Sequence, residues 1–173
     1  NGNNTFSEIA HFSGVAASDW SWGALMFDTD NDGLRDIYVC NGIYHDLTDQ
    51  DFISFFANDV MQKMALSGEK EKLNEIINKM GSKPQRNKLF KNNGDGTFTE
   101  ILTGDIVTDL GNSNSAIWGD YDNDGNLDIF ISNNPPNTSP PQLNFLYKNM
   151  GAPDYGFSKI TTAATQTDAN YTW

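Results

Sequence analysis

Residues 28–39, DTDNDGLRDIYV, place four acidic side chains within nine positions and then run directly into an apolar stretch rich in β-branched residues. A second copy, DYDNDGNLDIFI, occupies residues 120–131. Carboxylates held this close repel one another unless a positive group lies among them. The pattern therefore predicts a cation-binding loop that recurs along the chain and leads each time into a strand.

In each loop the acidic side chains occupy positions 1, 3, 5 and 9, with glycine at position 6. Alternate oxygen ligands around a glycine turn, with a main-chain oxygen at position 7, suit Ca²⁺, which takes about six to eight oxygens. Position 12, where a helix-loop-helix calcium site carries glutamate, is Val39 or Ile131, so each loop is expected to join two strands. The predicted ligands of the two calcium sites are Asp28, Asp30, Asp32, the Leu34 carbonyl and Asp36, and Asp120, Asp122, Asp124, the Asn126 carbonyl and Asp128.

We interpret both calcium ions as structural, because a cation that pins a tight hairpin stabilises the fold whether or not the protein senses calcium. A regulatory or catalytic ion is the alternative.

A second repeated feature is an Asn/Gly turn followed by an aromatic residue, in residues 1–10, 92–101 and 149–160. The interval from Phe6 to Asp28 equals that from Phe98 to Asp120. Short β-branched and aromatic runs with Asn-Gly and Asp-Gly turns predict antiparallel strands. Four strands are expected in each unit, at 20–27, 36–41, 87–92 and 97–102 in the first and at 114–119, 128–133, 143–149 and 156–161 in the second.

An insertion at 43–84 breaks the β pattern of the first unit. Thr48 and Asp51 can form a capping box, after which apolar residues recur at helical spacing over 52–64. A second helix is expected to end at Gly81. We expect the Phe/Met stripe of the first helix to pack on the sheets, with a surface for docking a partner as the alternative.

Four-stranded antiparallel sheets repeated along a chain describe the blades of a β-propeller. The predicted fold class is all-β, a partial propeller with a helical insertion. We expect a segment of a longer chain, because the third repeat is unfinished at Trp173 and half a repeat exposes an unpaired edge. The expected units are the last strand of a preceding blade at 1–12, a blade at 13–102 with the helical insertion at 43–84, a second blade at 103–161 and the first strand of a following blade at 162–173.

Composition excludes several classes of function. The net charge of -12 opposes binding to nucleic acid. No apolar run approaches the roughly 18 residues of a transmembrane helix, and the single cysteine, Cys40, excludes an internal disulfide and a thiolate zinc cluster. The sequence contains no nucleophile elbow, phosphate-binding loop or HExxH motif, so we do not expect an enzyme.

The stretches WGDYDNDGNLDIFISNN at 118–134, NFLYKN at 144–149 and LFKNNGDGTFTEI at 89–101 resemble FG-GAP/VCBS repeats, the propeller blades also found in the head of integrin α subunits. DWSWG at 19–23 and NGIYHDLTDQDF at 41–52 resemble the secreted bacterial branch of these repeats. The resemblance implies a propeller of about seven blades, calcium in the loops, and an extracellular or bacterial cell-surface setting associated with the outer membrane.

These observations predict a non-catalytic, calcium-stabilised propeller module that binds a protein or a glycan. Two alternatives stay open at this point. The chain could be part of a calcium-dependent polysaccharide-degrading enzyme, or an architectural subunit of an outer-membrane complex.

Overall fold

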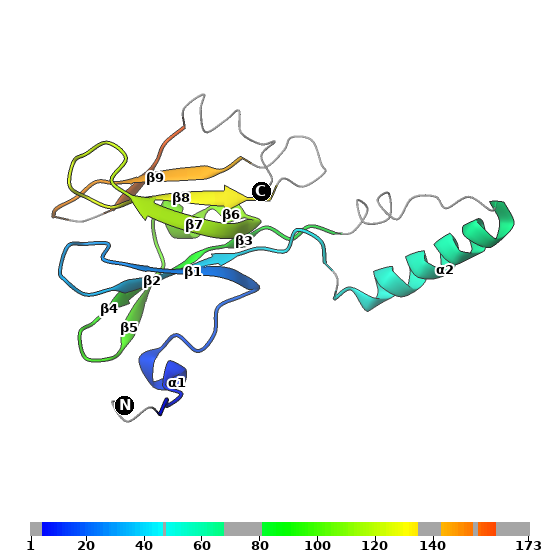
Figure 1. Ribbon diagram of the computed structural model, residues 1–173, viewed down its shortest axis with the longest axis horizontal. Helices are drawn as coiled ribbons and strands as arrows, with labels where there is room; N and C mark the ends of the chain where they lie inside the picture. Colours follow the sequence, from blue (N-terminus) through cyan, green and yellow to red (C-terminus); the bar gives the residue numbers. More distant parts are fainter. Residues whose placement is uncertain (1–4, 47, 68–80, 135–142, 154–155, 162–173) are drawn as a thin grey trace.

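Two four-stranded antiparallel sheets form the body of the computed structural model, which describes residues 5–46, 48–67, 81–134, 143–153 and 156–161 (Figure 1). Helices are few. The fold is therefore mostly β, as the alternating sequence patterns predicted, and across the described residues the two sheets do not close into a ring.

Each sheet is a meander, in which the strands lie side by side in the order in which they occur along the chain. The first sheet has the order β1 (Ser21–Phe27), β2 (Asp36–Asn41), β4 (Lys88–Asn92) and β5 (Phe98–Ile101). The second has the order β7 (Ser113–Gly119), β8 (Asp128–Asn133), β9 (Phe145–Asn149) and β10 (Phe157–Lys159). All eight strands lie within two residues of their predicted bounds.

The strand register repeats between the two sheets. Phe27 pairs with Asp36 at the end of β1, and Gly119 pairs with Asp128 at the end of β7. An irregularity in the pairing near the start of β1 recurs near the start of β7. Each acidic loop is therefore the connection between the first two strands of its sheet.

The hydrophobic core lies between the sheets. Tyr38 and Cys40 of β2 and Ile129 and Ile131 of β8 are fully buried. The short helix α4 (Asp105–Thr108) in the connection between the sheets adds Ile106 and Val107 to this core. Burial raises the pKa of the Cys40 thiol to about 12, so this cysteine is a packed apolar group and not a reactive thiol.

A chain of buried polar side chains joins the sheets at the end opposite the acidic loops. Asn87 Nδ2 donates to Ser113 Oγ at 3.0 Å, and that hydroxyl donates to Asn133 Oδ1 at 2.7 Å. Gly42 allows the close approach, because a Cβ there would lie 2.5 Å from Asn112 Cα. The short strands β3 (Gln85–Arg86) and β6 (Leu110–Gly111) pair beside this network and add a second link between the units.

The insertion contains a long helix, α2 (Gln50–Ser67), as the sequence predicted, but its cap is different. The Phe52 amide donates to Asp49 Oδ1 at 2.9 Å, so Asp49 caps the helix. Thr48 instead donates its hydroxyl to Asp46 Oδ1 at 2.5 Å. The predicted capping box with Thr48 is wrong because the helix begins one residue later than that box requires.

Helix α2 projects away from both sheets (Figure 1). Phe55 is 70% exposed, and the Phe52 and Phe56 rings stack on each other with centroids 4.3 Å apart. The expectation that the stripe packs on the sheets is therefore wrong for the aromatic residues that the structure describes. The two ends of the insertion meet at one end of the first sheet, where Ile43 pairs with Lys83 in a β-bridge. The helix extends outward from that end, so it does not lie over a face of either sheet (Figure 1). The second predicted helix lies outside the described residues.

The two ends of the chain, residues 1–12 and 162–173, were expected to be strands of neighbouring blades. Residues 5–9 are in no strand in the described structure, and a short helix, α1 (Ala10–Ser13), follows them. Phe6 is 98% exposed. The unit expected at 1–12 stays a prediction. The expected strand at 162–173 lies outside the described part of the chain. Among the described helices, none is both long and apolar enough to span a membrane.

Candidate metal centres

The two acidic loops share one backbone conformation. Asn31 and Asn123 have φ of 56° and 60°, and Gly33 and Gly125 have φ of 85° and 87°. This left-handed region is favourable for glycine and tolerable for asparagine, which explains why both loops read Asn-Asp-Gly. The turn directs the acidic side chains of each loop toward one another.

The first aspartate of each loop holds the turn closed. The amides of Asp32 and Gly33 donate to the two carboxylate oxygens of Asp28, at 3.2 and 2.9 Å. Asp120 accepts the corresponding amides in the second loop, both at 2.9 Å. These carboxylates therefore have a structural role in addition to any role as ligands.

The ninth aspartate of each loop is buried and braces the loop to the third strand of its sheet. Asp36 accepts the Thr29 amide at 3.0 Å and the Asn92 amide at 2.8 Å, and it also accepts the Thr29 hydroxyl. Asp128 accepts the equivalent amides of Tyr121 and Asn149, at 3.0 and 2.8 Å.

Each loop brings three of its four predicted carboxylates together. In the first loop Asp28, Asp30 and Asp36 offer oxygens that all lie within 4.8 Å of one another. In the second loop the group is Asp120, Asp122 and Asp124, so the fifth position takes the place of the ninth. Asp32 and Asp128 lie outside these groups, and the ligand roles of the Leu34 and Asn126 carbonyls stay predictions.

Two lysines that sequence reasoning missed also reach the loops. Lys91 of β4 forms an ion pair with Asp30 and lies 3.9 Å from Asp32, and Lys148 of β9 forms an ion pair with Asp122 and lies 3.0 Å from Asp124. The neighbouring carboxylates raise the pKa of both lysines. The pKa of Asp124 is lowered, first by the Asn126 amide and then by Lys148. The only sequence signal for the two lysines is that they occupy the same place in the repeated stretches LFKN (89–92) and LYKN (146–149).

The donor set fits a calcium ion. Every predicted ligand is a hard oxygen, and three of the four carboxylates in each loop lie close enough to share one cation. In the first loop Asp30 Oδ1 is buried and has no hydrogen-bond partner among the described residues. A buried carboxylate oxygen without a partner is unfavourable, and a bound cation would satisfy it.

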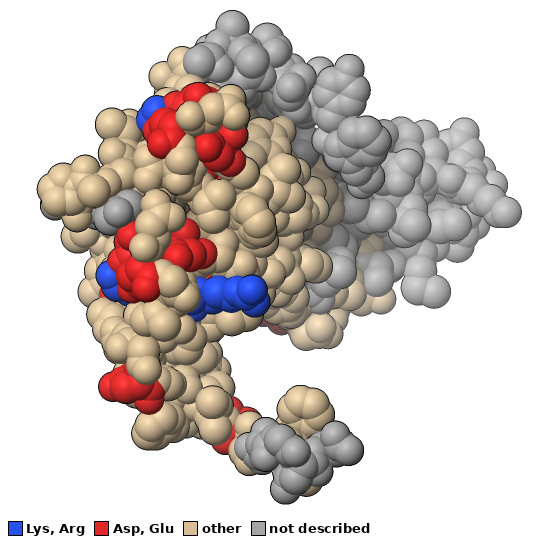
Figure 2. Space-filling view, turned by 60° about the vertical axis from the view of Figure 1, so that its left-hand side comes forward, with Lys and Arg blue, Asp and Glu red and all other residues tan. Residues whose placement is uncertain are grey.

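The two loops lie side by side at one end of the molecule, where Figure 2 shows two acidic groups with basic side chains next to them. Asn149 Nδ2 donates to the Thr29 carbonyl at 2.8 Å, and Asn31 Nδ2 donates to Asn126 Oδ1 at 3.3 Å. The first loop is therefore supported by the second sheet as well as by its own.

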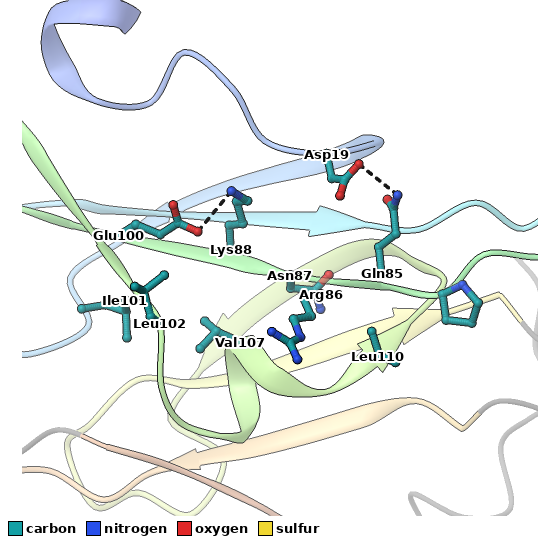
Figure 3. Close-up of a pocket in the computed structure, with 11 residues that line it drawn as sticks. Asp19, Gln85, Arg86, Asn87, Lys88, Glu100, Ile101, Leu102, Val107 and Leu110 are labelled. Atoms are coloured by element: carbon teal, nitrogen blue, oxygen red, sulfur yellow. Dashed lines mark hydrogen bonds and ion pairs between the residues drawn. The ribbon is translucent and has the colours of Figure 1, made fainter.

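A different candidate site lies at the opposite end of the sheets. It is a pocket of about 430 Å³ lined by residues of β3, β4, β5 and the connection that follows (Figure 3). Its rim carries an ion pair of Lys88 with Glu100 at 3.1 Å. The Arg86 side chain lies between Val107 and Leu110 (Figure 3) and has no ion pair among the described residues.

Repeated four-stranded antiparallel sheets, each with an acidic loop between its first two strands, define a class of β-repeat proteins. Residues 76–131 match the family model of the FG-GAP-like repeat. No curated protein and no solved structure matched the chain. The matched segment runs from before β3 into β8, so the repeat recognised in the sequence straddles the two sheets and includes only the second acidic loop. The resemblance seen in the sequence is confirmed for this segment.

Proposed function

We propose that the chain is part of a calcium-stabilised β-propeller that works outside the cell or on its surface, has no catalytic site and binds a protein or a glycan. The observation that carries the proposal is the recurrence of the acidic loop with the same backbone, the same amide contacts and the same place in each sheet. An FG-GAP-like repeat is typical of extracellular propeller-like modules, which supports the setting.

The propeller part of the proposal rests on the outer face of the second sheet. Leu25, Tyr38 and Leu89 of the first sheet pack toward the second sheet, and the last two are buried. Their counterparts in the repeat, Ile117, Phe130 and Leu146, lie on the outer face of the second sheet, where Ile117 is 65% exposed. The same residue types in the same register favour a further sheet packed there, as in successive propeller blades.

The calcium part of the proposal is tested by thermal unfolding of the full chain with and without chelator. Binding to the folded state alone stabilises it by about 2.7 kcal/mol per site when free calcium is about 100 times Kd. We expect calcium to raise Tm, and Asp30→Asn and Asp122→Asn each to remove part of that rise. Asp95→Asn is the matched control, because Asp95 lies in the β4–β5 hairpin outside both carboxylate groups.

A Tm that is the same with calcium and with chelator would contradict the calcium part of the proposal. An equal loss for Asp95→Asn would show that the effect is nonspecific charge removal.

The ligand part of the proposal is directed to the pocket around Arg86. Arg86 is a planar cation with no ion pair among the described residues, and it lies beside Leu110, which is 58% exposed. A partner that combines an acidic group with apolar surface would match this lining. Arg86→Ala should weaken capture of such a partner on an array of acidic peptides and acidic glycans, and Arg35→Ala, in the first acidic loop, is the control of equal charge.

The part of the proposal that the chain has no catalytic site is tested separately. Incubation of the full chain with polysaccharides should leave their length distribution unchanged, and chain cleavage that depends on calcium would favour the enzyme alternative.

A further inference from the structure

We propose that Lys91 and Lys148 compete with the calcium ion for the same carboxylates and so set the affinity of each loop. The inference rests on the proposed calcium function and adds residues outside the predicted ligand sets. Each lysine belongs to the third strand of its sheet, whereas the carboxylates that it contacts belong to the connection between the first and second strands.

The contacts of Lys148 show the competition most clearly. Its ammonium group forms an ion pair with Asp122 and lies 3.0 Å from a carboxylate oxygen of Asp124. These two aspartates are two of the three that gather their oxygens within 4.8 Å in the second loop. The ammonium is therefore within direct reach of the oxygens that would hold the ion.

Strand register fixes the position of both lysines. Phe90 pairs with Ile37, and Tyr147 pairs with Ile129, so the next residue in each third strand lies beside the ninth aspartate, at the end of the acidic loop. The residue after each lysine, Asn92 or Asn149, donates its amide to the ninth aspartate. The lysine thus reaches the carboxylates from a backbone that the loop itself holds in place.

An ammonium group and a calcium ion repel each other, so an ammonium group that stays in contact with the clustered carboxylates of a loop weakens the binding of calcium to them. A charge of one and a charge of two about 5 Å apart in water repel strongly enough to weaken calcium binding by about tenfold. The loop therefore has two arrangements, one neutralised by lysine and one by calcium. The lysine limits the mutual repulsion of the carboxylates when calcium is scarce, and it lowers the affinity for calcium.

The two loops differ in how closely the lysine engages. Lys148 lies within 3.0 Å of its second aspartate, whereas Lys91 lies 3.9 Å from Asp32. Asp30 also keeps one buried oxygen without a partner among the described residues. Removal of the lysine should therefore change the affinity of the second loop more than that of the first.

The experiment is calorimetric titration of the full chain with calcium chloride at fixed ionic strength. We expect Lys148→Met to tighten binding at one site by about tenfold and Lys91→Met to tighten the other by a smaller factor. Lys148→Arg keeps the charge and should retain the parental affinity. Lys88→Met is the matched control, because Lys88 also lies in β4 and forms an ion pair, with Glu100, away from the loops.

The outcomes separate this inference from the proposed function. If the parent chain binds no calcium, both are overturned. If the parent binds calcium but the methionine variants bind with the same or lower affinity, only the role of the lysines is overturned. A variant that folds only with calcium, as judged by near-ultraviolet circular dichroism, supports the competition. Failure of both methionine variants to fold even with calcium overturns it, because the lysines would then be needed alongside the ion.

Discussion

The two acidic loops have the same backbone and the same internal contacts, yet their surroundings differ. The first loop accepts a hydrogen bond from Asn149 of the second sheet, and the Asp30 side chain is 13% exposed. Asp122, its counterpart in the second loop, is 27% exposed. The local sequence therefore determines the shape of a loop, and the contact with the second sheet accompanies the lower exposure of Asp30. Asp32 and its counterpart Asp124, at 33% and 30% exposed, do not differ in this way.

The largest expected effect comes from the buried ninth aspartates. Asp36→Asn should lower the free energy of unfolding by about 3 kcal/mol, because asparagine keeps one acceptor oxygen and turns an NH2 donor toward donors that the second carboxylate oxygen accepted. Asp128→Asn should cost about 1 kcal/mol less, since Asp36 also accepts the Thr29 hydroxyl and no equivalent bond is formed by the Tyr121 side chain in the described second loop. Urea unfolding of both variants measures the difference. Equal losses would show that the surroundings of the two loops do not matter.

A smaller contrast is expected at the opposite end of the sheets. Asn87 accepts the Asn41 amide and also donates to Ser113 of the other sheet, whereas its counterpart Asn144 accepts the Asn133 amide. Asn87→Ala should lower the free energy of unfolding by about 2 kcal/mol and Asn144→Ala by about 1 kcal/mol. If the order is reversed in chemical denaturation, the polar link between the sheets is not stabilising.

The smallest effect is expected at the base of the insertion, which only the first unit carries. The pKa of Asp46 is lowered to about 2, first by Lys83 and then by Thr48. A folded-state pKa below the unfolded value means that the contribution of Asp46 to stability is present above about pH 4 and is lost as the pH falls to about 2. Asp46→Asn should therefore lower Tm at pH 7, and the difference should shrink as the pH falls through about 2. A Tm difference that is as large at about pH 2 as at pH 7 would contradict the ion pair as the cause.

Much of the fold could be predicted because its signals are local. Alternation with a period of two, together with Asn-Gly and Asp-Gly turns, located the eight strands of the two four-stranded sheets but not the two-residue strands β3 and β6. The spacing of acidic residues around Gly33 and Gly125 located both candidate sites, because a loop of this shape is specified within a few residues.

The features that could not be predicted depend on residues far apart in the sequence. Lys91 lies 61 residues from Asp30, and Lys148 lies 26 residues from Asp122. These contacts cannot be predicted from the sequence unless the register of the third strand in each sheet is known. The aromatic stripe of α2 has the period of a buried helix, but that period does not say whether a sheet face lies within reach.

The number of calcium ions bound per chain tests the account most directly. Equilibrium dialysis of the full chain against calcium, followed by elemental analysis, should give two ions per chain, one after Asp30→Asn, one after Asp122→Asn, and none in the double variant. Asp95→Asn should retain two. No bound calcium in the parent chain, or the same number in the parent and the double variant, would contradict the assignment of these loops as calcium sites.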